Sequence, residues 1–159
     1  MTENKYYLTK KGLEKLEKEY KALLGFKKKK TTGEEVPAIW HSEEVNPEYL
    51  AFQEDMSLLD ARLIEYENIL KNTEVITSPA REKRSEVCLG ARVTVKVDDG
   101  QIDEFEIVGT IEANPSLGRI SNESPVGSAF LGKKIGEEVI VSSPQKTVYR
   151  ITKIKYILL

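Results

Sequence analysis

The sequence predicts an α+β protein, in which an N-terminal antiparallel α-helical coiled-coil hairpin precedes a small antiparallel β-sheet domain with one short helix. Two patterns support this prediction. Apolar residues in the first half recur at alternating intervals of three and four, as along the seam of a coiled coil. In the second half they alternate with polar residues, as along strands that bury one face. A chain of 159 residues is long enough for two small domains.

Composition excludes several classes of protein. Lys and Arg total 24 and Asp and Glu total 26, so a formal net charge of -2 rules out a globally basic nucleic-acid coat. A single cysteine, Cys88, excludes an internal disulfide and a Cys-rich zinc site, and a single histidine, His41, excludes a catalytic histidine pair. The sequence shows neither a secretory signal nor an apolar run of about 18–20 residues, so we expect a cytoplasmic protein with no membrane partner.

The first helix is predicted to begin at Thr9, whose hydroxyl is suited to an N-cap. Its seam consists of Leu13, Leu16, Tyr20 and Leu23. The seam then meets Gly25 and the run Lys27–Lys30, and lysine takes the next apolar position. We therefore expect a helix of about 20 residues that frays or ends in this region.

The second helix has a clearer start. Asn46 is a favourable N-cap and Pro47 suits the first helical position, where its missing N–H is not needed. The seam then runs with spacings of 3, 4, 3, 4, 3 and 4 through Tyr49, Phe52, Met56, Leu59, Leu63, Tyr66 and Leu70. Asn72 is the predicted stop.

Charge indicates that these two helices pair with each other. Residues 5–30 contain ten Lys and three Glu, whereas residues 34–67 contain ten acids and one Arg. Opposite charges on facing flanks favour an antiparallel hairpin over self-pairing of either helix, so we expect a monomer. The hairpin is assigned to residues 1–76, with a tip loop at about 31–45. Residues 77–87 are interpreted as a linker because they contain few apolar side chains.

Residues 88–159 are predicted to form the sheet domain. Val93, Val95 and Val97 alternate with polar residues, and the turn Asp98–Gly100 leads into a returning strand through Phe105 and Ile107. Ser124 and Pro125 are expected to open a short helix that Gly132 closes. Two further strands are predicted around Val139–Val141 and Val148–Ile157, and a shift in alternation near Thr152 indicates a β-bulge.

Several strings, in order and spacing, resemble the bacterial GreA/GreB family of transcript cleavage factors. The first half carries Leu8-Thr9, Gly12, Lys15-Leu16, Asn46, Glu48-Tyr49, Arg62, Leu70 and Val75-Ile76. The second half carries Ile120-Ser121, Ser124-Pro125, Leu131-Gly132-Lys133, Gly136, Val139 and Pro144. Each string is weak alone, but together they extend over nearly the whole chain.

The resemblance implies an N-terminal coiled coil and an FKBP-like C-terminal domain. It implies that residues 88–159 dock on RNA polymerase near its secondary channel, with Glu123, Ser124 and Pro125 in the docking loop. The coiled coil would enter the channel and present acids that help hold a second magnesium ion of the polymerase. The polymerase would then hydrolyse its own backtracked RNA, so this chain would need no cofactor of its own and would not be an enzyme in isolation.

The tip departs from the family pattern. The family's Asp and Glu positions, counted back from Asn46, are occupied here by Ser42 and Val45, and Glu43 and Glu44 lie between them. Counting forward from the first helix places Glu43 on the Asp position instead. Three interpretations remain open: Glu43 and Glu44 replace the catalytic and metal-holding acids, they occupy the channel without promoting cleavage, or they are solvated loop charges.

Other residues have alternative interpretations. Lys27, Lys28, Lys29 and Lys30 either contact the phosphates of the backtracked RNA 3′ end or form a solvated charge run.

The function expected from the resemblance is that of an RNA polymerase-binding elongation factor that rescues backtracked complexes. The alternative within this family is a regulator that blocks or pauses polymerase without cleavage. Two rivals from other classes are a prolyl isomerase, suggested only by the implied fold, and a coiled-coil assembly module.

Overall fold

The computed structural model describes residues 4–33, 36–37, 46–142 and 144–157. The chain divides into two compact units. One unit is Glu14–Asn72, and the other combines Met1–Leu13 with Thr73–Leu159. Each unit is described by itself below. No helix in the described ranges is long and apolar enough to cross a membrane.

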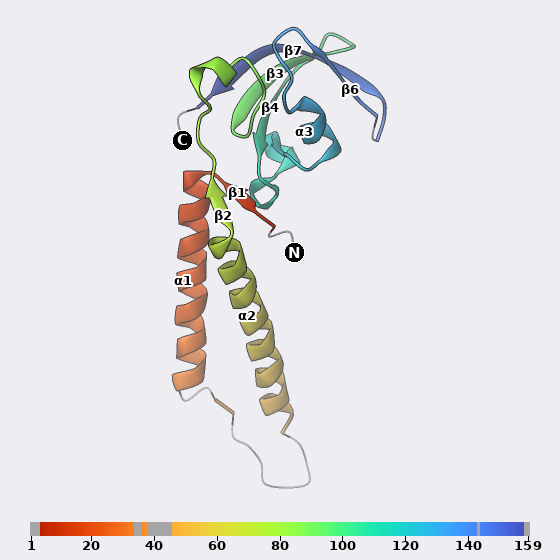
Figure 1. Cartoon of the computed structure of the whole chain (residues 1–159). Coiled ribbons are helices and arrows are strands. Elements are labelled where there is room, and N and C mark those ends of the chain that lie inside the picture. The colour runs from red at the N-terminus through yellow and green to blue at the C-terminus, as the bar shows by residue number, and fades with distance from the viewer. Residues whose placement is uncertain (1–3, 34–35, 38–45, 143, 158–159) are drawn as a thin grey trace. The chain divides into compact units, whose positions relative to one another are not determined.

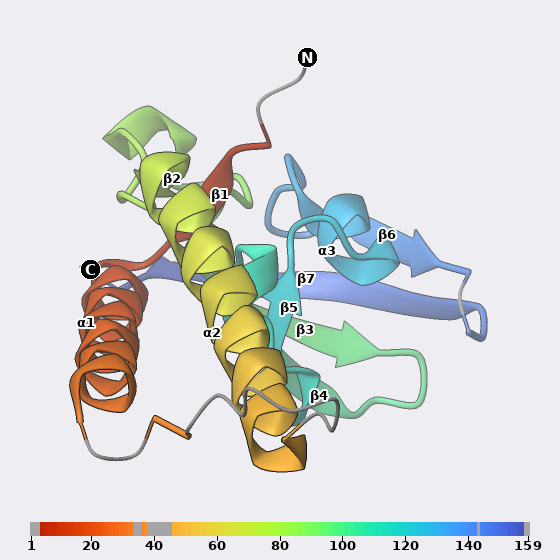
Figure 2. The same ribbon diagram turned by 90° about the horizontal axis from the view of Figure 1, so that it is seen from below.

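The unit Glu14–Asn72 contains α1 (Lys10–Thr32) from Glu14 onward and the whole of α2 (Pro47–Lys71), two antiparallel helices that lie side by side in Figures 1 and 2. The predicted seam faces inward. Leu16 of α1 and Leu59 and Leu63 of α2 are buried, and the other apolar residues predicted for the α2 seam are partly buried. Asn46 caps α2 as predicted, because its side-chain oxygen accepts a hydrogen bond from the Glu48 N–H at 3.0 Å.

The prediction that the first helix frays or ends near Gly25 is wrong. α1 is a continuous helix of 23 residues through Gly25 and the lysine run. A glycine costs a helix only about 1 kcal/mol relative to alanine, and lysine is a good helix former. The hydroxyl groups of Thr31 and Thr32 also donate to the Lys27 and Lys28 carbonyls at 2.9 and 2.6 Å. Lysines in the last turn interact favourably with the helix dipole.

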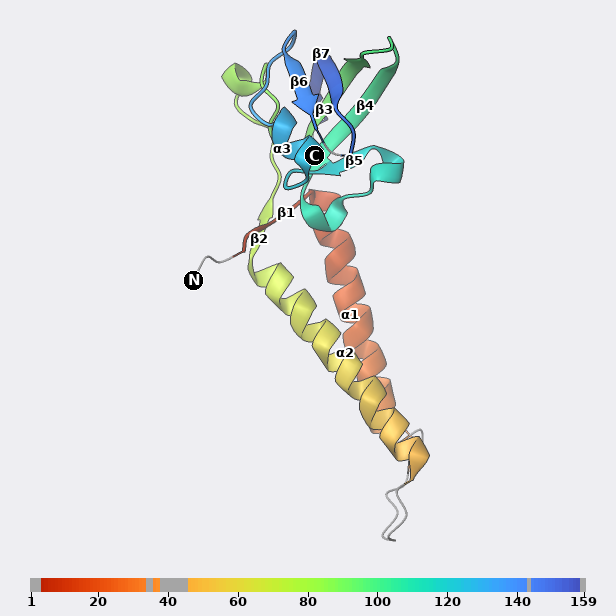
Figure 3. The same ribbon diagram turned by 90° about the vertical axis from the view of Figure 1, so that its right-hand side faces the viewer.

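The other unit contains a five-stranded sheet in the order β5-β4-β3-β7-β6 (Figure 3). Its strands are β3 (Ala91–Val97), β4 (Ile102–Val108), β5 (Arg119–Ser121), β6 (Glu138–Val141) and β7 (Thr147–Tyr156). The predicted α+β class is confirmed, but the sheet is only mostly antiparallel, because β5 pairs with β4 in parallel. The sequence analysis missed β5, since three residues are too few to show an alternation.

The predicted bulge is present in β7. The register with β3 shifts between Thr94, which lies opposite Lys153, and Val95, which lies opposite Ile151. Thr152 is therefore the extra residue, and its hydroxyl donates to the Thr94 carbonyl at 3.0 Å. A bulge of this kind bends the strand and increases the local twist of the sheet.

The core of this unit lies between the sheet and the short helix α3 (Pro125–Phe130). Phe130 is fully buried and packs with Val93, Val95 and Ile107 in one cluster. Gly132 follows α3 with a φ of 79°, the left-handed conformation that glycine adopts without strain. The predicted opening and closing signals of this helix are thus both confirmed.

A second, two-stranded sheet joins the N-terminus to the segment after α2. β1 (Tyr6–Leu8) pairs in parallel with β2 (Thr73–Val75), and Leu8 and Ile76 are buried beside it. This pair explains why Met1–Leu13 belongs with Thr73–Leu159. The unit that combines these two segments is called the C-terminal unit below. Three short 3₁₀ helices complete the unit: η1 (Arg81–Lys83), η2 (Thr110–Glu112) and η3 (Pro115–Leu117).

Candidate functional site

The predicted tip acids, Glu43 and Glu44, lie outside the described residues, as do Ser42 and Val45. The described helices that flank this segment end at Thr32 and begin at Pro47. Within the described ranges, no group of three or more His, Cys, Asp or Glu side chains is arranged to hold a metal ion. The roles of Glu43 and Glu44 therefore remain proposals.

The four lysines of the predicted RNA-contacting run have different surroundings. The Lys27 ammonium lies 2.5 Å from an Asp60 oxygen on α2, and the Lys30 ammonium lies 5.5 Å from the centroid of the Phe26 ring. Lys28 and Lys29 are exposed. Lys27 lies at a position of the seam where an apolar residue would be expected. Its ion pair with Asp60 compensates the lysine charge at that position. Of the four, Lys28 and Lys29 are therefore the best candidates for phosphate contacts.

We expect the Lys27–Asp60 pair to contribute modestly to hairpin stability. The side chains are 39% and 49% exposed, and ion pairs exposed to this degree are worth about 0–1 kcal/mol. A double-mutant cycle of Lys27→Ala and Asp60→Ala, followed by urea unfolding, should give a coupling energy of about 0.5 kcal/mol at low salt. At about 1 M salt the coupling should disappear. A coupling energy that persists at high salt would contradict this assignment.

Two reciprocal hydrogen bonds connect the helices farther along the hairpin. The Tyr20 hydroxyl donates to Glu67 at 2.7 Å, and the Tyr66 hydroxyl donates to Glu19 at 3.0 Å. Each acceptor carboxylate raises the pKa of its tyrosine. The sequence analysis missed these bonds, although the mirrored order of Glu19-Tyr20 and Tyr66-Glu67 was a usable signal. Together with Lys27–Asp60, they define the antiparallel register of the hairpin.

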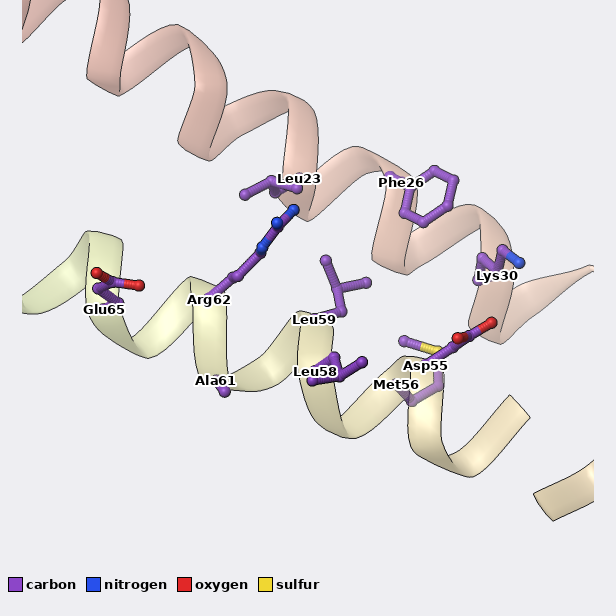
Figure 4. A pocket seen from close by; sticks show the side chains of 10 residues that line it. All are labelled: Leu23, Phe26, Lys30, Asp55, Met56, Leu58, Leu59, Ala61, Arg62 and Glu65. Carbon is purple, nitrogen blue, oxygen red and sulfur yellow. The ribbon is translucent and has the colours of Figure 1, made fainter. Parts of the chain in front are cut away.

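An apolar groove of about 560 Å³ lies along the same helix pair (Figure 4). Its lining comes from both helices: Leu23, Phe26, Lys30, Asp55, Met56, Leu58, Leu59, Ala61, Arg62 and Glu65. Phe26 is 51% exposed and Leu58 is 68% exposed. Exposed apolar side chains outside the seam therefore line this side of the hairpin.

The predicted docking residues form a compact local structure before α3. The Ser124 Oγ accepts from the Gly127 N–H at 3.0 Å, and its hydroxyl donates to the Ser121 carbonyl at 2.7 Å. The Glu123 carboxylate accepts from the Thr110 hydroxyl at 2.9 Å. Pro125 is exposed at the first helical position. The serine is thus an N-cap, and the loop presents Glu123 and Pro125 on the surface.

The aromatic side chains of the C-terminal unit pack against one another. The Phe130 ring centroid lies 6.1 Å from that of Phe105 and 5.5 Å from that of Tyr149. A prolyl isomerase needs an open pocket lined by such rings, whereas here Phe130 is fully buried among them. This packing argues against the prolyl-isomerase interpretation.

Known proteins are similar to this chain in sequence over nearly its whole length. The family described as "Transcription elongation factor, GreA/GreB, C-term" matches residues 82–156. Transcription elongation factor GreA of Clostridium acetobutylicum is 41% identical over 96% of this chain and 98% of its own. Transcription elongation factor GreA of Thermomicrobium roseum is 39% identical over 93% of this chain and 95% of its own. Among solved structures, GreA factor homolog 1 (Gfh1) of Thermus thermophilus matches 96% of this chain and 99% of its own, with 20% identity and a TM-score of 0.43.

These matches define the class as transcription elongation factors. Because curated relatives are about 40% identical over nearly the whole chain, the protein belongs to the GreA/GreB family.

Proposed function

We propose that this protein binds RNA polymerase, inserts its helical hairpin into the secondary channel and stimulates the polymerase's own cleavage of backtracked RNA. The observation that carries the proposal is the hairpin itself. Its register is fixed by hydrogen bonds at Glu19 and Tyr20, and α1 continues as a helix to Thr32. A stiff hairpin of this kind is suited to carry the acids between its helices into a narrow channel.

In this proposal, Glu43 and Glu44 would help to hold a magnesium ion of the polymerase active site. Carboxylates are the ligands that this hard cation prefers, and the ion activates water and stabilises charge on phosphate. Lys27–Lys30 would lie near the phosphates of the displaced RNA 3′ end, with Lys28 and Lys29 exposed for that contact. The nuclease activity would belong to the polymerase, and the chain would act as a monomer in the cytoplasm.

A second candidate function is a regulator that enters the channel without promoting cleavage. Ser42 and Val45 at the family's usual Asp and Glu positions favour it. A transcript cleavage assay separates the two. Backtracked complexes of the cognate polymerase are incubated with the protein and magnesium, and RNA shortening is followed on a gel while binding is measured in parallel. Faster shortening supports the cleavage function. Binding without shortening supports the blocking function, and absence of binding contradicts both.

The docking loop gives a separate prediction. Replacing Pro125 with alanine is expected to weaken polymerase binding roughly tenfold, which corresponds to about 1.4 kcal/mol. The physical reason is that an exposed proline at the start of α3 offers a rigid apolar contact without needing a hydrogen-bond partner. The dissociation constant is measured by titrating labelled polymerase.

A matched control for this variant exists in the same unit. Pro115 is also exposed at the first position of a short helix, η3. The Pro115→Ala variant should bind as the wild type does. Equal dissociation constants for the Pro125→Ala variant and the wild type would show that this loop does not dock.

A further inference from the structure

We infer that Glu112 is a positioning residue that fixes the first turn of α1 in the C-terminal unit and so sets the helical hairpin for its task. The inference rests on the proposed function. Glu112 lies at the end of η2, and its side chain is only 9% exposed. It is 103 residues distant in sequence from the helix start that it contacts. Thr9, Gly12 and Glu112 all belong to the same unit.

Both carboxylate oxygens of Glu112 bind the start of α1. One accepts from the Thr9 backbone N–H at 2.5 Å, and the other accepts from the Thr9 hydroxyl at 2.7 Å. The same Thr9 Oγ accepts from the Gly12 N–H at 3.0 Å, which is the N-cap hydrogen bond. Glu112 therefore orients the group that caps α1.

Charge makes this contact necessary. α1 has no acidic residue in its first turn and begins with Lys10 and Lys11, which are unfavourable near the positive end of a helix dipole. The Glu112 carboxylate supplies the missing negative charge from another part of the chain. Arg119 also donates to the carboxylate oxygen that accepts from the Thr9 hydroxyl, in an ion pair at 3.1 Å.

Gly12 supplies independent support for this role. A Cβ built on Gly12 would overlap the Glu112 carboxylate. Glycine at this position is therefore explained by the space that Glu112 occupies, not by the helix, in which alanine would be the better residue. The first turn of α1 therefore leaves just enough space at Gly12 for the Glu112 carboxylate.

The chain passes between its two units only at Leu13–Glu14 and Asn72–Thr73. The first passage is continuous helix whose initial turn is the one that Glu112 holds. Loosening that turn would leave the core around Phe130 and the seam around Leu59 in place. We therefore predict that a variant without this contact still folds in both units and still binds the polymerase, but that its hairpin stimulates cleavage less.

The test is the full-length Glu112→Ala variant in the transcript cleavage assay. We expect polymerase affinity within about twofold of the wild type, but a cleavage rate at saturating protein at least about tenfold lower. Hydrogen exchange of the Thr9, Gly12 and Leu13 amides should be at least about tenfold faster in the free protein, because the Thr9 N–H loses its acceptor and the Thr9 cap is no longer held in place. Glu112→Gln keeps one acceptor oxygen but loses the second acceptor and the negative charge, so its cleavage rate should fall between those of Glu112→Ala and the wild type.

Two further variants guard against a purely structural explanation. Gly12→Ala displaces the carboxylate while improving helix propensity, so it should reproduce the Glu112→Ala phenotype. Glu104→Ala removes an exposed acid that pairs with Arg92 and does not contact Thr9, so it should behave as the wild type does.

The outcomes separate this inference from the proposed function. Wild-type cleavage at saturation by Glu112→Ala would overturn the inference, and so would a loss of binding equal to the loss of cleavage. Unchanged exchange at the Thr9, Gly12 and Leu13 amides of the free variant would overturn it whether or not the wild type stimulates cleavage. If the wild-type protein itself fails to shorten RNA, the proposed function fails, and so does the role assigned to Glu112 in cleavage.

Discussion

Replacing Glu43 and Glu44 together with alanine is expected to return transcript cleavage to the rate of the polymerase alone while leaving polymerase binding intact. The proposed role of this pair is to complete a magnesium site that the polymerase holds only in part. Removing both carboxylates removes the ligands that recruit the ion, and the attacking water is then no longer activated. The proposed docking loop around Pro125 is unchanged, so affinity should persist. Cleavage rate and dissociation constant are measured on the same backtracked complexes.

The chain provides a matched control for the loss of two negative charges. Glu34 and Glu35 also lie between α1 and α2 in sequence, but they are seven or more residues from Ser42 and Val45, whereas Glu43 and Glu44 lie between these two family positions. The Glu34→Ala/Glu35→Ala variant should retain stimulation. Unchanged cleavage in the Glu43→Ala/Glu44→Ala variant would remove that pair from the mechanism and favour the channel-blocking function.

Features set by local sequence could be predicted. The α2 seam from Tyr49 to Leu70 has a period that only a helix satisfies, and the Asn46-Pro47 start is a short-range signal. The cap at Ser124 is equally local, since its hydrogen bond to Gly127 extends over only three residues. The bulge at Thr152 disturbs an otherwise regular alternation, so it too was visible in the sequence.

Features set by distant contacts could not be predicted. β1, β2 and β5 have three residues each, and each depends on a partner strand that sequence periodicity does not identify. The continuation of α1 past Gly25 depends partly on Asp60, which lies on the other helix. The Glu112–Thr9 contact joins residues more than a hundred positions apart, and nothing near Thr9 in sequence indicates an acidic partner.

The largest effect on stability is expected from Phe130→Ala in the C-terminal unit. Phe130 is fully buried, and its ring contacts those of Phe105 and Tyr149. Truncating a buried phenylalanine removes its transfer free energy and leaves a cavity, which together cost about 3–5 kcal/mol. Because α3 is only six residues long and is anchored in the core by this ring, little in the helix itself would compensate.

Urea unfolding, monitored by near-ultraviolet circular dichroism, should show the loss, because this signal reports the packing of aromatic side chains, Tyr149 among them. Hydrogen exchange of the β3 amides should accelerate, whereas the α2 amides should exchange as in the wild type, since they belong to the other unit. The control is Ile140→Ala, because Ile140 is 56% exposed on β6 and its truncation should change stability by no more than about 0.5 kcal/mol. A loss near that of the control would contradict this prediction, because even a site that collapses completely loses the transfer free energy of the ring. Polymerase binding should weaken with Phe130→Ala, because the residues proposed to dock lie at the start of the same packed helix.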